Sequence, residues 1–223
     1  MTFVVASIGG LWASYLPSFM RGLVITIEIT GLSLGVAIVL GAILAGFRLS
    51  RLKVLRLVGT VYVDIVRSVP VLVLLFLAYY GLGQLGLTLS GILSATLALG
   101  LFYAALLCEI FRGGIQGVDK GQREAANALG LGRIGGFVRV ILPQAVLRVL
   151  PPSTNQFSNI IKDSSLVVTI GVADLMGRSY EASATTFRPM DMFVLAGLIY
   201  MALYLVIARA IGRWELNVQR RRG

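Results

Sequence analysis

Lys162 and Asp163 have the strongest potential for chemistry in this sequence, because they stand together inside a hydrophobic stretch. Asn155 lies before them and Ser164 directly after them, so polar groups surround the pair. Adjacent helical residues point about 100° apart, so the two charges cannot share one face of a regular helix. We therefore expect either a break in the helix that exposes backbone groups to a cavity, or a separate partner for each side chain on another element.

Other ionisable residues also fall in apolar surroundings. Glu28 is isolated in the stretch 22–47, whereas Asp64 and Arg67 are three residues apart and so lie on one helix face. Glu109 and Arg112 repeat this spacing. Neighbouring side chains of opposite charge at this spacing form ion pairs, and we expect structural pairs at both positions, with Arg67 also a candidate for ligand contact.

The residue types exclude most enzymatic chemistry. The sequence has no histidine and a single cysteine, Cys108, so an intramolecular disulfide is impossible and a metal centre is not expected. None of the three lysines follows a glycine, so the nucleotide-binding pattern Gly-Lys-Ser/Thr is absent. We expect no catalytic residue, cofactor site or metal site on this chain.

Hydropathy places these residues in a membrane. The chain is 57% hydrophobic and 13% charged, with a mean hydropathy of +0.87, whereas soluble domains carry about 25% charged residues. A spanning helix needs about 20 apolar residues. We predict an all-α, polytopic protein with one domain over residues 1–223 and an interfacial or short extracytoplasmic segment at 3–20. The five predicted transmembrane helices are 22–47, 58–82, 88–110, 147–175 and 192–211.

Charge placement predicts the orientation of these helices. The net charge is +10, which alone would also suit nucleic-acid binding, but the basic residues cluster at three places beside the spans, as in cytoplasmic loops. The clusters lie at 48–56, at 112–148 and in the tail at 209–222, where Arg221 and Arg222 are the last two arginines. Five spans with these three clusters on one side place the N-terminus outside and the C-terminus in the cytoplasm, with no nucleic-acid partner.

The polar segment 119–143 has the signals of a helix pair outside the bilayer. Asp119 and Gln122 have the spacing of a capping box, which predicts a helix that begins at Lys120. Gly130 suits the left-handed position after its end, and a second helix from 133 is expected to stop at Pro143. By spacing alone, this pair either docks another protein or packs under the bundle.

These residues carry a resemblance. Glu124-Ala125-Ala126, Gly130 and Ile141-Leu142-Pro143 resemble the EAA signature of permease subunits of bacterial ATP-binding-cassette (ABC) importers. The resemblance extends to residues 22–30, 62–82, 109–132, 141–156 and 160–175, which are similar to the polar-amino-acid subfamily. Residues 67–70 and 173–175 look most like glutamate/aspartate-type permeases.

The resemblance implies a type I importer permease fold in the bacterial inner membrane. It implies that the seven signature residues dock on a dimer of ATPase subunits, which would bind ATP and Mg²⁺ on their own chains. The other implied partners are a second permease copy or paralogue and an extracytoplasmic amino-acid-binding protein. The stretch around Lys162 and Asp163 would lie near the central cavity, contacting substrate or holding two permeases together. The alternative is an ion-coupled secondary amino-acid transporter.

Pathway candidates follow from the two charges of an amino acid. Its carboxylate would meet Lys162 or Arg67, and its ammonium would meet Glu28 or Asp163.

Overall fold

The computed structural model describes residues 2–220, with side chains described over 9–210 and at 212 and 213. The described residues form helices and no strand. In chain order the elements are α1 (Thr2–Leu49), α2 (Lys53–Ser68), α3 (Val71–Phe76), a π-helical turn (Leu77–Gly81), α4 (Leu82–Gln84), α5 (Gly91–Gln116), α6 (Lys120–Ala128), α7 (Arg133–Gly136), a second π-helical turn (Phe137–Ile141), α8 (Leu142–Asp163), a 3-10 segment (Ser164–Ile170), α9 (Leu175–Thr186) and α10 (Pro189–Arg220).

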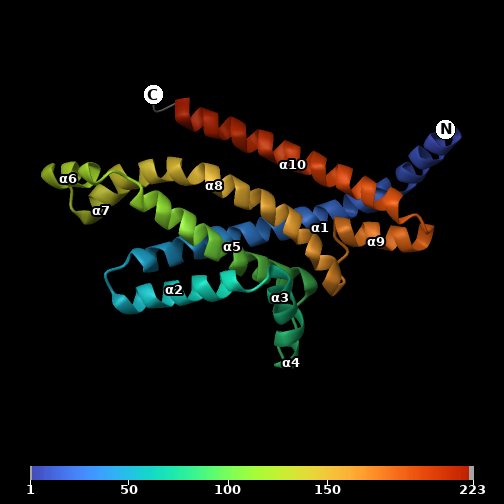
Figure 1. Ribbon diagram of the computed structural model, residues 1–223, viewed down its shortest axis with the longest axis horizontal. Coiled ribbons are helices and arrows are strands. Elements are labelled where there is room, and N and C mark those ends of the chain that lie inside the picture. The colour runs from blue at the N-terminus through green and yellow to red at the C-terminus, as the bar shows by residue number, and fades with distance from the viewer. Residues whose placement is uncertain (1, 221–223) are drawn as a thin grey trace.

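The molecule is elongated along α1. Helices α5, α8 and α10 run lengthwise beside it, α6 and α7 lie at one end, and α9 lies near the opposite end (Figure 1). The N-terminus lies near α9, and α10 leads back toward the end that holds α6 and α7. Arg221 and Arg222 of the predicted basic tail lie outside the described residues.

Four stretches of the described chain are long and apolar enough to cross a membrane, at Gly9–Leu49, Gly91–Gln116, Arg133–Ile170 and Pro189–Ala210. They correspond to four of the predicted spans. The remaining candidate is a pair of helical stretches, Lys53–Ser68 and Val71–Gln84, which pass the test only together. A total of five therefore requires that this bent pair cross as one broken span.

The segment 3–20 is not separated from the first span, because the chain is helical without interruption from Thr2 to Leu49; its interfacial or extracytoplasmic location stays a prediction. Pro17 removes one backbone donor, but contacts with distant helices hold both sides of it. Trp12 donates its indole N–H to the carbonyl of Asp191 at 3.1 Å, and Phe19 is fully buried against α9 and α10 residues. Tertiary packing thus outweighs the local cost of the proline.

The predicted span 58–82 is bent at Pro70 and is not one straight helix. The helix axis turns by 103° between α2 and α3. The residue before a proline is disfavoured in the helical region, and Val69 accordingly takes φ −103° and ψ 132° before Pro70. The chain then turns away from the α1–α2 hairpin, as α3 and α4 show (Figure 1).

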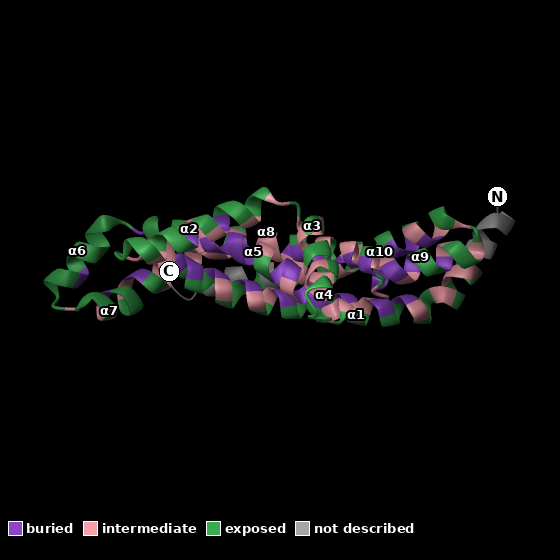
Figure 2. Ribbon diagram, turned by 90° about the horizontal axis from the view of Figure 1, so that it is seen from below, coloured by how far each residue is buried: buried purple, intermediate pink, exposed green. Residues whose placement is uncertain are grey.

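Small residues allow the two central helices to approach closely. A Cβ added to Gly100 of α5 would lie 2.7 Å from a methyl carbon of Val36 on α1, and one added to Gly41 would lie 3.1 Å from the Ala104 carbonyl oxygen. Close backbone approach at small residues is the usual packing mode of membrane helices. The buried stripe along α5 follows from this contact (Figure 2).

The third predicted span, 88–110, corresponds to α5, which begins at Gly91 after the N-cap Ser90 and ends at Gln116.

Candidate functional site

Local capping defines both ends of α6. The Asp119 carboxylate accepts the backbone N–H of Gly121 at 2.7 Å, as the predicted N-cap should. Gly130 has φ +72°, and the Gly130 and Leu131 N–H groups bond to the carbonyls of Asn127 and Ala126, both at 3.0 Å. This is a complete Schellman motif, so the predicted start of this helix and its glycine end are confirmed.

Helix α6 packs on α7 with one side and exposes the other. Ala126 is 3% exposed, and a Cβ added to Gly136 would lie 3.3 Å from its methyl group. Glu124, Ala125 and Gly130 are exposed, and most of α6 is coloured as exposed in Figure 2. The predicted coupling residues therefore divide into an outward set and one alanine that positions α6 on α7.

The predicted stop at Pro143 was wrong. The chain widens into the π-helical turn Phe137–Ile141 and continues as α8 to Asp163. The N–H of Leu142 bonds to the carbonyl of Phe137, and a proline in the first turn of the following helix needs no N–H of its own. Ile141 is buried, Leu142 is exposed and Pro143 is half-buried.

A side-chain contact also ties α6 to α8. Gln144 donates its amide N–H to the side-chain oxygen of Gln122 at 3.1 Å and to the carbonyl of Val140 at 3.0 Å. The predicted reciprocal bond of a capping box is thus replaced by a bond between helices. This bond and the packing of Ala126 on Gly136 hold α6, α7 and the start of α8 together.

One of the two alternatives expected for Lys162 and Asp163 is realised, because each side chain meets a partner on another helix. Helix α8 ends at Asp163 and a 3-10 segment follows. Asp163 accepts the hydroxyl of Tyr103, on α5, at 2.7 Å, whereas the Lys162 ammonium lies 5.3 Å from the ring centroid of Tyr204, on α10. The two charges therefore face different helices, with a hydrogen bond on one side and a cation–π contact on the other.

Lys162 also borders a cavity of about 340 Å³ between α8 and α10. Its lining residues are Ile161, Lys162, Tyr200, Met201 and Tyr204.

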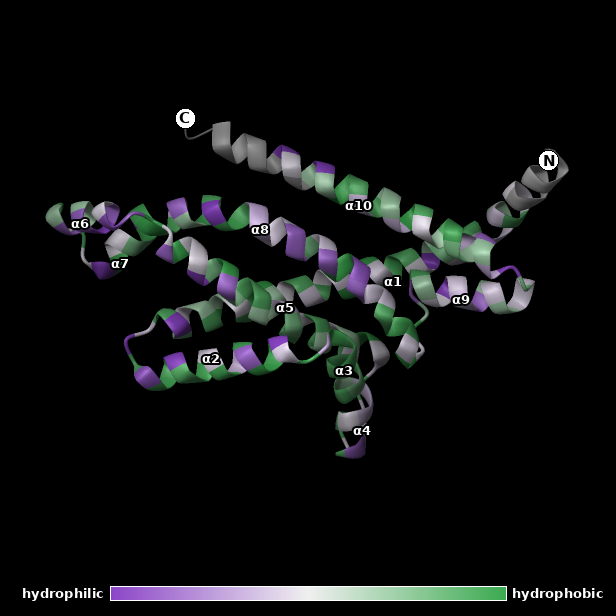
Figure 3. Ribbon diagram, viewed as in Figure 1, coloured by the Kyte–Doolittle hydropathy of each residue, from purple (hydrophilic) through white to green (hydrophobic). Residues whose placement is uncertain are grey.

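Polar side chains continue along the exposed face of α8. Asn155, Asn159 and Lys162 are at i, i+4 and i+7 and all three are exposed. Figure 3 shows hydrophilic residues recurring along this helix, although it belongs to a candidate span. Ser164 differs from them, because it is fully buried and donates its hydroxyl to the Ile161 carbonyl at 2.7 Å. These residues thus form a polar stripe, Asn155–Asn159–Lys162, that ends at the helix break.

Two of the predicted pathway residues stay away from this stripe. Glu28 on α1 and Arg67 on α2 are both exposed, and no hydrogen bond or ion pair among the described side chains joins either of them to α8. The predicted ion pair between Asp64 and Arg67 was wrong, since both side chains point outward on α2 without a recorded contact.

The other predicted pair is present. Arg112 contacts Glu109 at 2.7 Å, and Arg48, at the end of α1, forms a second ion pair with the same carboxylate.

A buried aspartate missed in the sequence joins three helices. Asp174 is fully buried and caps α9 by accepting the Gly177 N–H at 2.8 Å. Its carboxylate also accepts the hydroxyls of Tyr200 at 3.2 Å and Thr26 at 3.5 Å. Burial raises the pKa of Asp174 to about 6, against the opposing effect of these hydrogen bonds. The capping pattern Asp174-x-x-Gly177 was the available signal for the cap, but the sequence gives no sign of the partners on α1 and α10.

The sequence is similar to permease proteins over most of its length. A glutamine ABC transporter permease of Bacillus subtilis, given as probable, is 34% identical over 91% of this chain and 94% of its own length. An arginine transport system permease of the same organism is 35% identical over 86% and 88%. A nopaline transport permease of Agrobacterium fabrum is 35% identical over 90% and 88%.

A solved amino acid ABC transporter, described as crystallised with histidines, superposes with a TM-score of 0.87. It is 33% identical and covers 92% of this chain and 96% of its own. The inward-facing MetNI methionine transporter superposes with a TM-score of 0.71 at 19% identity, covering 91% and 95%, and so supports the fold.

The family comparison covers most of the chain. Residues 37–215 match the family described as binding-protein-dependent transport system inner membrane component. The relatives above are named as permeases, which confirms the prediction of a translocation subunit that is not an enzyme. The all-helical architecture is thus shared with solved importers, and the chain belongs to the family of binding-protein-dependent transport system inner membrane components.

Proposed function

We propose that this chain is a permease subunit of an ABC importer for polar amino acids, driven through α6 by a separate ATPase subunit. The observation that carries the proposal is the exposed surface of α6. This helix lies outside every candidate span, and it presents Glu124, Ala125 and Leu129, the last of them 79% exposed. An apolar, exposed tip beside a carboxylate suits a protein partner rather than solvent. ATP and Mg²⁺ would then bind on the partner.

The directions of the helices support the predicted orientation. Helices α6 and α7 lie at one end of the molecule, and α10 leads back toward that end while α1 begins near the other (Figure 1). With the α6 end in the cytoplasm, the N-terminus lies outside the inner membrane and the C-terminus inside. An extracytoplasmic binding protein would then deliver substrate at the α9 end.

The polar stripe supports a pair of permeases. Polar groups on a spanning helix are costly against lipid and belong in a protein interior or a wet cavity. Because Asn155 and Lys162 are exposed on this chain, a second copy or a paralogue would cover them. In that pair Lys162 would meet a substrate carboxylate, Asp163 would meet the ammonium, and Ser164 would hold the break between them.

The relatives support the class of substrate. Their names specify glutamine, arginine and nopaline, so glutamate or aspartate remains a prediction for this chain. Uptake assays with these amino acids, using the full importer and its binding protein, would assign the substrate.

Charge reversal tests the docking role. In Glu124→Lys the exposed carboxylate of α6 becomes an ammonium, and we expect the ATPase to co-purify at least ten-fold less and uptake to fall with it. Glu181→Lys makes the same change on α9, at the other end of the molecule, where the Glu181 carboxylate is exposed and its ion pair with the half-buried Arg178 contributes little. Equal ATPase recovery in both variants would rule out docking through α6.

Reconstitution distinguishes the ion-coupled alternative. An importer of this class transports nothing without its ATPase, whereas a secondary transporter is active alone. We therefore expect vesicles that contain this chain alone to show no amino-acid uptake under an imposed proton or sodium gradient. Uptake under either gradient would establish the alternative.

A further inference from the structure

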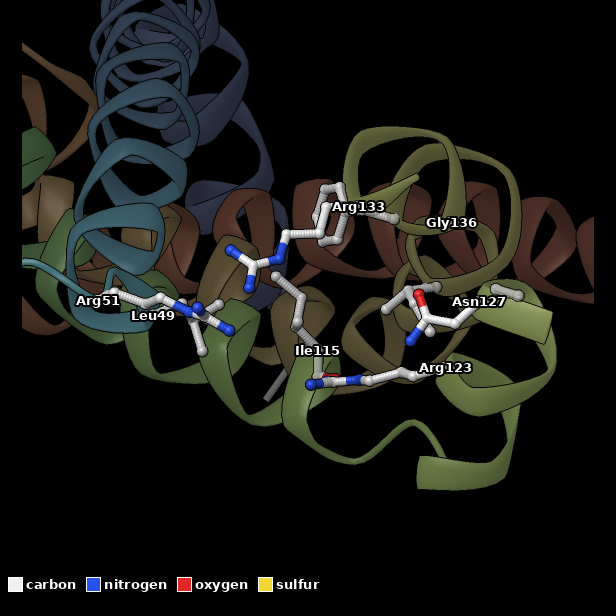
Figure 4. Close-up of a pocket in the computed structure, with 10 residues that line it drawn as sticks. Leu49, Arg51, Ile115, Arg123, Asn127, Arg133 and Gly136 are labelled. Atoms are coloured by element: carbon white, nitrogen blue, oxygen red, sulfur yellow. The ribbon is translucent and has the colours of Figure 1, made fainter. Parts of the chain in front are cut away.

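Three arginines surround a cavity of about 490 Å³ between the spans and the α6–α7 pair. Arg51 comes from the α1–α2 loop, Arg123 from α6 and Arg133 from the start of α7. Their guanidinium groups extend toward one another across the opening (Figure 4). Three segments that are distant in sequence thus direct positive charge into one space.

No carboxylate balances these charges. Acidic residues are absent from the lining of the cavity, and the ion pairs recorded among the described residues involve none of the three arginines. Arg123 donates to the Ile115 carbonyl at 2.8 Å, which fixes its side chain without neutralising it. Like charges gathered in this way favour an anion between them.

The walls of the cavity indicate which anion fits. Leu49 and Ile115 lie at the ends of two candidate spans, and Phe137 and Ile141 add further apolar surface. The cavity is therefore amphipathic and lies at the ends of these two candidate spans, where we place the headgroup level of the bilayer. Guanidinium groups bind phosphate oxygens in a bidentate manner, and basic pockets between helices on the cytoplasmic side hold anionic headgroups.

We propose that this cavity binds the phosphate headgroup of an anionic phospholipid, with the start of its acyl chains against the apolar wall. The lining residues of α6 are Arg123, Ala126 and Asn127, at i, i+3 and i+4, so they form one face of the helix. Glu124 and Ala125 lie outside that face. The lipid and the ATPase of the proposed function would therefore use different sides of α6.

A bound headgroup would connect the α1–α2 loop to the helix pair. Arg51 belongs to the loop between α1 and α2, whereas Arg123 and Arg133 belong to the α6–α7 pair. The phosphate would bridge them in place of a carboxylate. An effect of this bridge on coupling to the ATPase rests on the proposed function, but the binding of the lipid does not.

The test is lipid retention by the full chain purified without an ATPase. The protein is reconstituted in nanodiscs of phosphatidylcholine, alone or mixed with phosphatidylglycerol. The phosphatidylglycerol molecules that stay bound to the protein after its release from the nanodisc are counted by native mass spectrometry. A basic residue near an anionic surface contributes a factor of about five in affinity. We therefore expect Arg51→Gln with Arg133→Gln to weaken retention about thirty-fold.

The matched control is Arg56→Gln with Arg139→Gln. Both arginines are exposed and close in sequence to the cavity arginines, but neither lines the cavity. We expect retention by this control to match the wild type, and Arg51→Lys with Arg133→Lys to restore most of it. Equal loss in control and cavity variants would reduce the effect to general surface charge and overturn the proposal.

Two further outcomes would overturn the assignment to lipid. Inorganic phosphate that displaces the bound lipid at millimolar concentration would make this a site for a free anion. Cavity variants that keep the lipid but lose the ATPase would assign the arginines to carboxylates of the partner. Since retention is measured with this chain alone, a negative result leaves the docking role of Glu124 untouched.

Discussion

Removal of the Tyr103 hydroxyl is the most direct perturbation of the helix break. Tyr103 is 2% exposed in the core cluster of α5, and its hydroxyl donates to the last residue of α8, Asp163, at 2.7 Å. Tyr103→Phe keeps the buried ring and deletes this bond alone. The variant therefore measures how firmly the end of α8 is held to α5.

The magnitude follows from burial and charge. A hydrogen bond to a charged group stabilises a fold by about 1.5–3 kcal/mol. Asp163 is half-buried, so water replaces part of the lost bond, and we expect the lower end, about 1.5 kcal/mol. For a chain of this size that corresponds to a fall in the unfolding temperature of roughly 3–6 °C.

The assay is a double-mutant cycle on thermal unfolding of the purified chain in nanodiscs. Tyr103→Phe, Asp163→Asn and the double variant should show a coupling free energy of about 1 kcal/mol or more, because either single change removes the same charge-assisted bond. Tyr204→Phe is the control. It keeps the ring beneath the Lys162 ammonium and should change stability by less than about 0.5 kcal/mol. Additive effects in the cycle would refute the contact.

Three further predictions concern single positions. Gly114→Val should lower the unfolding temperature and the yield of folded protein, because its Cβ would lie 2.1 Å from the Val149 methyl group. Gly113 has open space around it, so Gly113→Val should behave as wild type in the same measurement. Gly130→Ala should destabilise the end of α6 by about 1 kcal/mol, because φ is +72° there, and amide exchange at 126–131 should become faster. Gly132→Ala is the control: this residue has φ −54° and open space around it, so amide exchange at 126–131 should stay unchanged. Burial raises the pKa of Asp174 to about 6, so its contribution to stability is largest below pH 4 and is lost as the pH rises through 6. The unfolding temperature of Asp174→Asn should therefore not fall across this pH range as that of the wild type does. The same pH profile in the variant and the wild type would contradict the role of Asp174.

Local chemistry made α6 predictable. An aspartate before the helix and a glycine after it act on backbone groups within four residues, so their effect can be read without knowledge of the fold. Asp119 and Gly130 behave accordingly. The hydropathy of the long apolar runs is similarly independent of context, and four continuous candidate spans follow from it.

The prolines show where such reading stops. Pro17 stays inside a helix that distant contacts hold on both sides, whereas Pro70 ends a helix, with the following α3 packed on the core through Val71 and Leu72. Pro143 follows a π-helical turn, which leaves it in the first turn of α8. All three residues restrict the backbone in the same way. The outcome depends on which neighbouring segment finds tertiary partners, and that information is not local.

The same limit applies to the pathway candidates: the sequence locates them, but what they contact depends on distant helices. A lysine and an aspartate side by side in a span had to diverge, because helix geometry allows nothing else. Which groups they would meet depended on helices 60 and 42 positions away, where Tyr103 and Tyr204 lie. No local pattern distinguishes Tyr103 as the donor, since a buried tyrosine on α5 is as well suited to packing as to donating a hydroxyl. Its selection follows from the direct packing of α5 on α8, where Gly114 lies against Ala145 and Val149. A substitution that separates these two helices at Gly114 would therefore move the donor of Asp163 without touching either partner of that bond.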